Sequence, residues 1–93
     1  MPRKRTADPR QACLELIGDD ALLMFADGHD GAILGIVEHD GIPIVVYDTA
    51  KILRLLRSRD GMSRDEAEEF FEYNIAGAFM GKQTPLFLRH IGR

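Results

Sequence analysis

Carboxylate and imidazole side chains, which serve as metal ligands and as general acids and bases, gather in two short stretches of this sequence. The members are Asp27, His29 and Asp30 in ADGHDG, and Glu38, His39 and Asp40 farther along the chain. Each stretch holds two carboxylates and one imidazole. The chemistry to consider first is therefore a metal-assisted or acid–base reaction, with Asp27, His29 and Asp30 as the candidate ligands or catalytic groups.

The two stretches flank one strand of a predicted β-hairpin. The segments AILGIVEH (32–39) and IPIVVY (42–47) surround Asp40-Gly41, a favoured pair for a two-residue type I′ turn. About seven residues separate the ends of the first strand, which places the two stretches on the order of 20 Å apart. One site cannot easily use both, and Asp, Gly and His are also ordinary turn residues. We therefore expect no enzyme, cofactor or metal site, and keep the loop with His29 as the alternative.

Capping residues predict helices before and after the hairpin. Asp8, followed by a proline, begins a first helix, and Gly18 suits its end. A second helix starts after Asp48 or Thr49 and ends at Gly61. A third has the most complete start signal, an S-x-x-E capping box.

Ser63 and Glu66 form this capping box at the start of the third helix. The helix is predicted to run to Met80, with Gly81 as the left-handed residue after it. At 100° per residue, Asn74 falls in the middle of its apolar side. Three acidic residues fall on the opposite, solvated side: Glu68, Glu69 and Glu72.

A buried amide without a partner costs roughly 1–3 kcal/mol. Asn74 is therefore predicted to be a structural joint that ties the third helix to a neighbouring loop or strand edge. Gly77 and Gly81 lie on the same flank, where they would let a strand or a partner helix come close.

The order of elements predicts an α+β domain, with helices packed on one face of a small antiparallel sheet. The sheet is expected to contain the hairpin 32–47 and a strand at 85–88. The apolar run 21–25 is too short to classify by its period, and it is predicted as a further strand with a helix as the alternative. Residues 9–93 form this single domain, after a basic tail at 1–8.

Composition and charge exclude several classes of protein. With 45% hydrophobic and 29% charged residues, the 93-residue chain reads as globular. Its net charge is −3, so binding to a nucleic-acid backbone is expected only through the basic head. That head consists of Arg3, Lys4, Arg5 and Arg10.

No apolar run is long enough to span a membrane. The single Cys13 allows no internal disulfide, which favours the cytoplasm.

The C-terminal half carries an F-E-[FY]-N-[IV]-x-G-A-x-x-G-x-x-T-P-x-F pattern. Its residues are Phe71-Glu72-Tyr73-Asn74-Ile75, Gly77-Ala78, Gly81, Thr84-Pro85 and Phe87, after Asp60-Gly61-Met62-Ser63. In this pattern the chain resembles an uncharacterised family of small acidic bacteriophage and prophage proteins, over roughly residues 18 to 88. The resemblance implies a phage or mobile-element context and supplies no chemistry.

The leading hypothesis is a small non-enzymatic protein that binds a host protein, for example as an inhibitor of a host defence or regulatory complex. The acidic surface of Glu68, Glu69 and Glu72 could meet a basic partner. Two alternatives stay open: a small enzyme that uses Asp27, His29 and Asp30, and a nucleic-acid-associated protein that acts through the basic head. Association with a second copy is also compatible with the small size of the chain.

Overall fold

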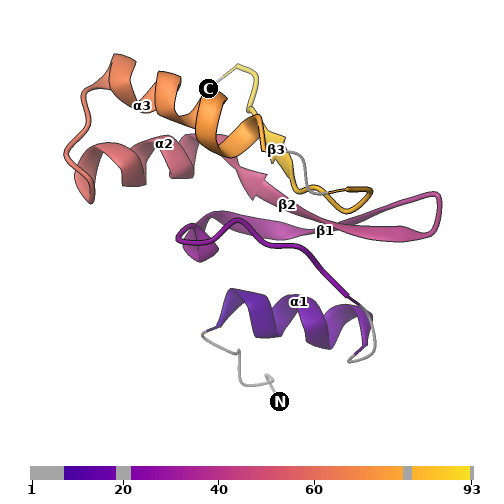
Figure 1. Ribbon diagram of the computed structural model, residues 1–93. Coiled ribbons are helices and arrows are strands. Elements are labelled where there is room, and N and C mark those ends of the chain that lie inside the picture. Colours follow the sequence, from indigo (N-terminus) through magenta and orange to yellow (C-terminus); the bar gives the residue numbers. More distant parts are fainter. Residues whose placement is uncertain (1–7, 19–21, 79–80, 93) are drawn as a thin grey trace.

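The computed structural model describes residues 8–18, 22–78 and 81–92 (Figure 1). Within these ranges the chain forms three α-helices and a mixed sheet of three strands, which confirms the predicted α+β class. The helices are α1 (Pro9–Ile17), α2 (Thr49–Ser58) and α3 (Arg64–Phe70), and the strands are β1 (Ile33–His39), β2 (Ile42–Asp48) and β3 (Leu86–Leu88). A 3₁₀ turn, η1 (Asp30–Ala32), precedes β1, and a π-helical segment, η2 (Phe71–Ala76), continues α3. None of the helices in these ranges is long and apolar enough to cross a membrane.

The β1–β2 hairpin forms in the register that a two-residue turn at Asp40-Gly41 sets, with Val37 opposite Ile44. Its turn places Asp40 at φ 53° and Gly41 at φ 78°. A type I′ turn requires these two left-handed conformations, so the hairpin prediction is confirmed.

The third strand corrects the prediction of an antiparallel sheet. β3 pairs with β2 in parallel, with Val46 beside Leu86 and Asp48 beside Leu88. Between these strands the chain runs out through α2 and back through α3, and the two helices lie side by side (Figure 1). The two helices act as the crossover connection that a parallel pair needs.

The segment 22–26 forms neither the strand nor the helix predicted around 21–25, and Ala21 lies outside the described residues. It is held by its contacts with the core rather than by backbone hydrogen bonds to a neighbouring strand. The backbone N–H of Ala26 donates a hydrogen bond of 2.7 Å to the Tyr47 hydroxyl. Three of its apolar side chains, Leu23, Phe25 and Ala26, pack against the buried cluster.

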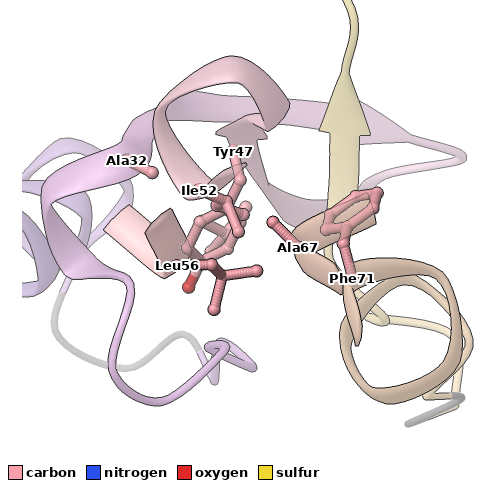
Figure 2. Close-up of a cluster of buried hydrophobic side chains, with 7 residues drawn as sticks. Ala32, Tyr47, Ile52, Leu56, Ala67 and Phe71 are labelled. Atoms are coloured by element: carbon pink, nitrogen blue, oxygen red, sulfur yellow. The ribbon is translucent and has the colours of Figure 1, made fainter. Parts of the chain in front are cut away.

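The hydrophobic core lies between β2 and the two helices α2 and α3 (Figure 2). Its buried members are Ala32, Val45, Tyr47, Ile52, Leu56, Ala67 and Phe71. Phe87 of β3 completes the cluster, with its ring centroid 5.6 Å from that of Tyr47 and 5.3 Å from that of Phe71. The parallel strand β3 therefore brings an aromatic ring to the junction of β2 and the third helix.

The predicted capping of the first two helices is confirmed. The Asp8 carboxylate accepts a hydrogen bond of 3.0 Å from the backbone N–H of Arg10 at the start of α1. Of the two candidate caps of α2, Asp48 performs the role and accepts from the backbone N–H of Ala50 at 3.0 Å.

The third helix starts as predicted and changes its winding halfway. Ser63 and Glu66 form the capping box through hydrogen bonds of 2.8 and 3.1 Å. From Phe71 to Ala76 the winding is π-helical, and the helix ends there rather than at Met80, which lies outside the described residues.

The two glycines after η2 have separate roles. Gly81 has a φ of 93°, as predicted for a left-handed residue. Gly77 has an ordinary negative φ, but a Cβ atom there would lie 2.8 Å from the backbone oxygen of Glu72. The close approach at Gly77 is therefore to the preceding turn of its own helix, and the predicted approach of a strand of the same sheet is wrong. The alternative, the approach of a partner helix, stays a prediction.

Candidate functional site

The two carboxylates of the ADGHDG loop are bound by an arginine of α1. Arg10 Nε lies 2.8 Å from Asp30 Oδ1, and its Nη2 lies 2.9 Å from Asp27 Oδ1. The guanidinium also stacks over the Phe25 ring, 4.8 Å from the centroid. Hydrogen bonds to Asp27 and Asp30 raise the pKa of Arg10 further above its ordinary value. Asp27 and Asp30 thus fasten α1 to the loop.

The ion pairs of Arg10 with Asp27 and Asp30 also bear on the predicted basic head, of which Arg10 is a member. Arg10 is engaged within the fold, whereas Arg3, Lys4 and Arg5 lie outside the described residues. Across residues 8–18, 22–78 and 81–92, no group of three or more His, Cys, Asp or Glu side chains is arranged to hold a metal ion.

His29 is the buried ionisable group of the loop. Its side chain is 6% exposed, and its Nδ1 atom is buried without a hydrogen-bond partner. Burial and the positive charge of Arg59 hold the pKa of His29 below its ordinary value of 6.5, against the opposing charges of Asp60 and Asp30. The imidazole is consequently neutral at neutral pH.

An Arg–Asp pair from the end of α2 lies beside this imidazole. Arg59 donates from Nε and Nη2 to the two carboxylate oxygens of Asp60, both at 2.9 Å, and from Nη1 to the carbonyl oxygen of Gly28 at 2.6 Å. This two-point pair lowers the pKa of Asp60, so the carboxylate stays charged and the pair stays formed. The bond to Gly28 joins the end of α2 to the loop that carries His29.

A cleft of about 450 Å³ opens between this loop and the α3–η2 helix. Most of its lining is apolar, and three phenylalanine rings belong to it: Phe25, Phe70 and Phe87. Its polar lining consists of Asp27, His29, Arg59, Asp60 and Asn74. An apolar hollow with a few convergent polar groups, some with perturbed pKa values, is the usual form of a binding site.

Asn74 lies at the rim of this cleft and is exposed, so its predicted role as a buried joint is wrong. A π-helical turn bonds each residue to the fifth one along, which shifts every later side chain around the axis. As a result Ile75 turns partly toward the core in the place that a uniform helix assigns to Asn74.

Gln83 makes a different connection, which does not involve the third helix. Its Nε2 atom donates hydrogen bonds to the carbonyl oxygens of Leu22 and of Pro43, the latter at 3.2 Å. It therefore ties the turn before β3 to both the 22–26 segment and β2. The sequence signal was a glutamine two residues before a proline, in a turn whose backbone needs partners.

The predicted acidic surface is divided by an arginine of the C-terminal segment. Arg89 Nη2 lies 3.2 Å from Glu68 and 3.3 Å from Glu72. Glu69 instead lines a smaller hollow, of about 420 Å³, next to the cleft. Two exposed aromatic residues also line this hollow, Phe70 at 37% and Tyr73 at 76% exposure.

The second stretch of ionisable residues stays at the hairpin tip. His39 Nε2 lies 3.6 Å from Asp40 Oδ2, and both side chains are exposed. Neither residue lines the cleft, in keeping with the prediction that one site cannot use both stretches.

Sequence reasoning missed four residues that shape the cleft: Phe25, Arg59, Phe70 and Phe87. Comparison with protein-family models, with curated proteins and with solved structures finds no match for the chain.

Proposed function

We propose that the protein is a non-enzymatic binding protein that holds a partner protein at the cleft between the His29 loop and the α3–η2 helix. The observation that carries this proposal is the exposure of Phe70 and Tyr73 beside the cleft. Aromatic residues are enriched at protein interfaces and supply much of their binding energy.

The form of the surface favours a protein over a small molecule. The cleft and the neighbouring hollow share three lining residues, Asp60, Phe70 and Asn74. Together they make an extended, open surface, whereas a small-molecule pocket encloses most of its ligand. Phe70 and Tyr73 are three residues apart on the helix and so can present neighbouring rings to one partner.

The charges around the cleft indicate what the partner carries. Glu66 and Glu69 line the hollow beside the aromatic residues, and the acids of the cleft itself are engaged by arginines. A partner that fits inserts an apolar side chain into the cleft and places basic residues near Glu69. Of the predicted acidic surface, Glu69 is thus the member we assign to binding, because Glu68 and Glu72 are held by Arg89.

The resemblance to small acidic phage proteins supplies the context of this proposal. The partner would be a host protein in the host cytoplasm, and the consequence of binding would be inhibition of a host defence or regulatory complex. The neutral, buried imidazole of His29 then serves as a fixed wall of the cleft.

The test is a pull-down from host lysate with matched variants. Tyr73→Ala and Phe70→Ala remove the exposed aromatic rings, and we expect each to reduce capture of the partner about tenfold or more. Ile91→Ala removes an exposed aliphatic side chain that lines none of the hollows around the cleft. It is the control and should capture the partner as the parent does.

Two outcomes count against the proposal. One is the absence of any enriched protein at both low and high salt. The other is a partner whose capture is unaffected by Tyr73→Ala and Phe70→Ala, because it would have to bind elsewhere.

A further inference from the structure

A groove of about 530 Å³ runs between α2 and α3, and it shares no lining residue with the His29 cleft. Its floor is apolar, with Leu53 from α2, Met62 from the connecting turn and Ala67 from α3. Three exposed arginines border it: Arg54, Arg57 and Arg64.

These three arginines differ from the others in the described ranges. Arg10, Arg59 and Arg89 are each bound to one or two carboxylates. The guanidinium groups of Arg54, Arg57 and Arg64, by contrast, have no ion pair or hydrogen bond within residues 8–18, 22–78 and 81–92.

The one carboxylate in the groove does not neutralise them. Glu68 lines the groove, but it shares the single positive charge of Arg89 with Glu72, and one carboxylate cannot balance three guanidinium groups. Arg64 is also the first residue of α3, where a positive charge opposes the helix dipole. The folded chain, with a net charge of −3, thus keeps an uncompensated positive cluster beside an apolar floor.

We propose that the α2–α3 groove binds an acidic segment of a protein, with an apolar side chain on the floor and Asp or Glu side chains on Arg54, Arg57 and Arg64. Arg54 and Arg57 are three residues apart on one helix, so their Cβ atoms lie roughly 5–6 Å apart. Carboxylates three or four residues apart on an acidic amphipathic helix have the same spacing, and Arg binds carboxylates at two points.

The apolar floor is the reason for choosing a protein segment over a nucleic acid. A phosphate backbone would use the three arginines but leave Leu53 and Met62 without a partner. The remaining acidic surface would also repel a long polyanion. Met62 can adapt its shape to different apolar side chains, which suits a groove that receives one.

Two synthetic peptides test the proposal on the intact protein. One is an amphipathic acidic helix with leucine anchors, and the other has the same sequence with Gln in place of Glu. Titration into ¹⁵N-labelled protein should shift the amide signals of Leu53, Arg54 and Arg57 with the acidic peptide, and leave those of His29 and Asn74 in place. The Gln peptide should bind about tenfold more weakly or worse.

Protein variants test whether the arginines of the groove, rather than the net charge of the protein, determine binding of the acidic peptide. Arg54→Gln and Arg57→Gln should each weaken binding of the acidic peptide several-fold. Lys51→Gln, which removes a positive charge from the same helix outside the groove, is the control and should change little. Tyr73→Ala should also leave this binding unchanged, so that failure here and failure of the His29 cleft are distinguishable.

Other results would overturn the proposal. An acidic peptide with serine in place of its leucine anchors should bind more weakly than the leucine peptide. Equal affinity of the two peptides would show that the apolar floor does not contribute to binding. Tighter binding of a single-stranded DNA oligonucleotide, abolished by Arg54→Gln, would make the groove a nucleic-acid surface. Groove signals that shift with protein concentration alone would assign it to a second copy of this chain.

Discussion

At the scale of the residue, His29 combines burial, an unpartnered ring nitrogen and a pKa below its ordinary value. Such a residue costs stability when it must take up a proton inside the fold, because its charged form loses hydration and meets the charge of Arg59. Its effect can therefore be measured through the pH dependence of folding.

We expect the free energy of unfolding to fall as the pH decreases from about 6.5, because the unfolded chain then protonates His29 more readily than the folded protein does. The loss should level off below the pKa of His29 in the folded state. Urea unfolding at a series of pH values measures this dependence. His29→Phe, which keeps a buried ring without a titrating group, should remove this contribution.

The matched control for that experiment is His39→Gln at the exposed hairpin tip. It should keep the pH dependence of the parent. A His29→Phe variant with the parent's slope between pH 6.5 and lower values would show that another group is responsible.

At the scale of the element, the change from α3 to η2 decides which residues of the third helix face the core. Up to Phe71 a uniform helical period places Ala67 and Phe71 correctly, since both are buried, whereas Phe70 is exposed. Beyond Phe71 the wider winding exposes Asn74 and turns Ile75 inward. Gly77 follows the π-helical turn at a position where a larger residue would meet the Glu72 carbonyl oxygen.

Two substitutions test this account of the helix. Asn74→Ala should change the free energy of unfolding by less than about 0.5 kcal/mol, as expected for an exposed residue. Gly77→Ala should destabilise the fold by about 1 kcal/mol or more, although alanine is the better helix former, since its methyl group has no room. Urea unfolding of both variants gives the comparison.

The reverse ranking would contradict the π-helical winding. If Asn74→Ala were the more destabilising change, the amide would have a structural partner after all. A neutral or stabilising Gly77→Ala would mean that the turn before it has space for a methyl group.

At the scale of the whole molecule, arginines join segments that are distant in the sequence. Arg10 fastens α1 to the 25–30 loop, Arg59 fastens the end of α2 to Gly28, and Arg89 fastens the C-terminal segment to the third helix. Each of these three arginines is paired with carboxylates, whereas the arginines of the described residues that have no carboxylate partner lie at the α2–α3 groove.

Removing the ion pairs of Arg10 should loosen the attachment of α1 to the 25–30 loop. Arg10→Gln is expected to lower the hydrogen-exchange protection of α1 and of the 25–30 loop, while the global free energy of unfolding falls by no more than about 1 kcal/mol, because the ion pairs are partly exposed. Arg54→Gln, which breaks no ion pair, should leave that protection unchanged. Equal protection of α1 in both variants would mean that apolar contacts alone hold α1.

Local chemistry made much of the fold predictable. Asp40-Gly41 determines its own turn, and Ser63 with Glu66 determines a helix start, because each depends on residues within a few positions. The parallel pairing of β3 and the path of 22–26 were predicted wrongly, since both depend on contacts with distant residues such as Tyr47 and Gln83.

The candidate site follows the same division. The sequence by itself determined the hairpin, the caps and the separation of the two ionisable stretches, all of which follow from spacing along the chain. Only the tertiary structure decided that Arg10 would bind Asp27 and Asp30, and that His29 would be left at the wall of an aromatic cleft. The reason is that ion pairing and burial act between elements, and their outcome depends on which side chains the packed core leaves within reach of one another.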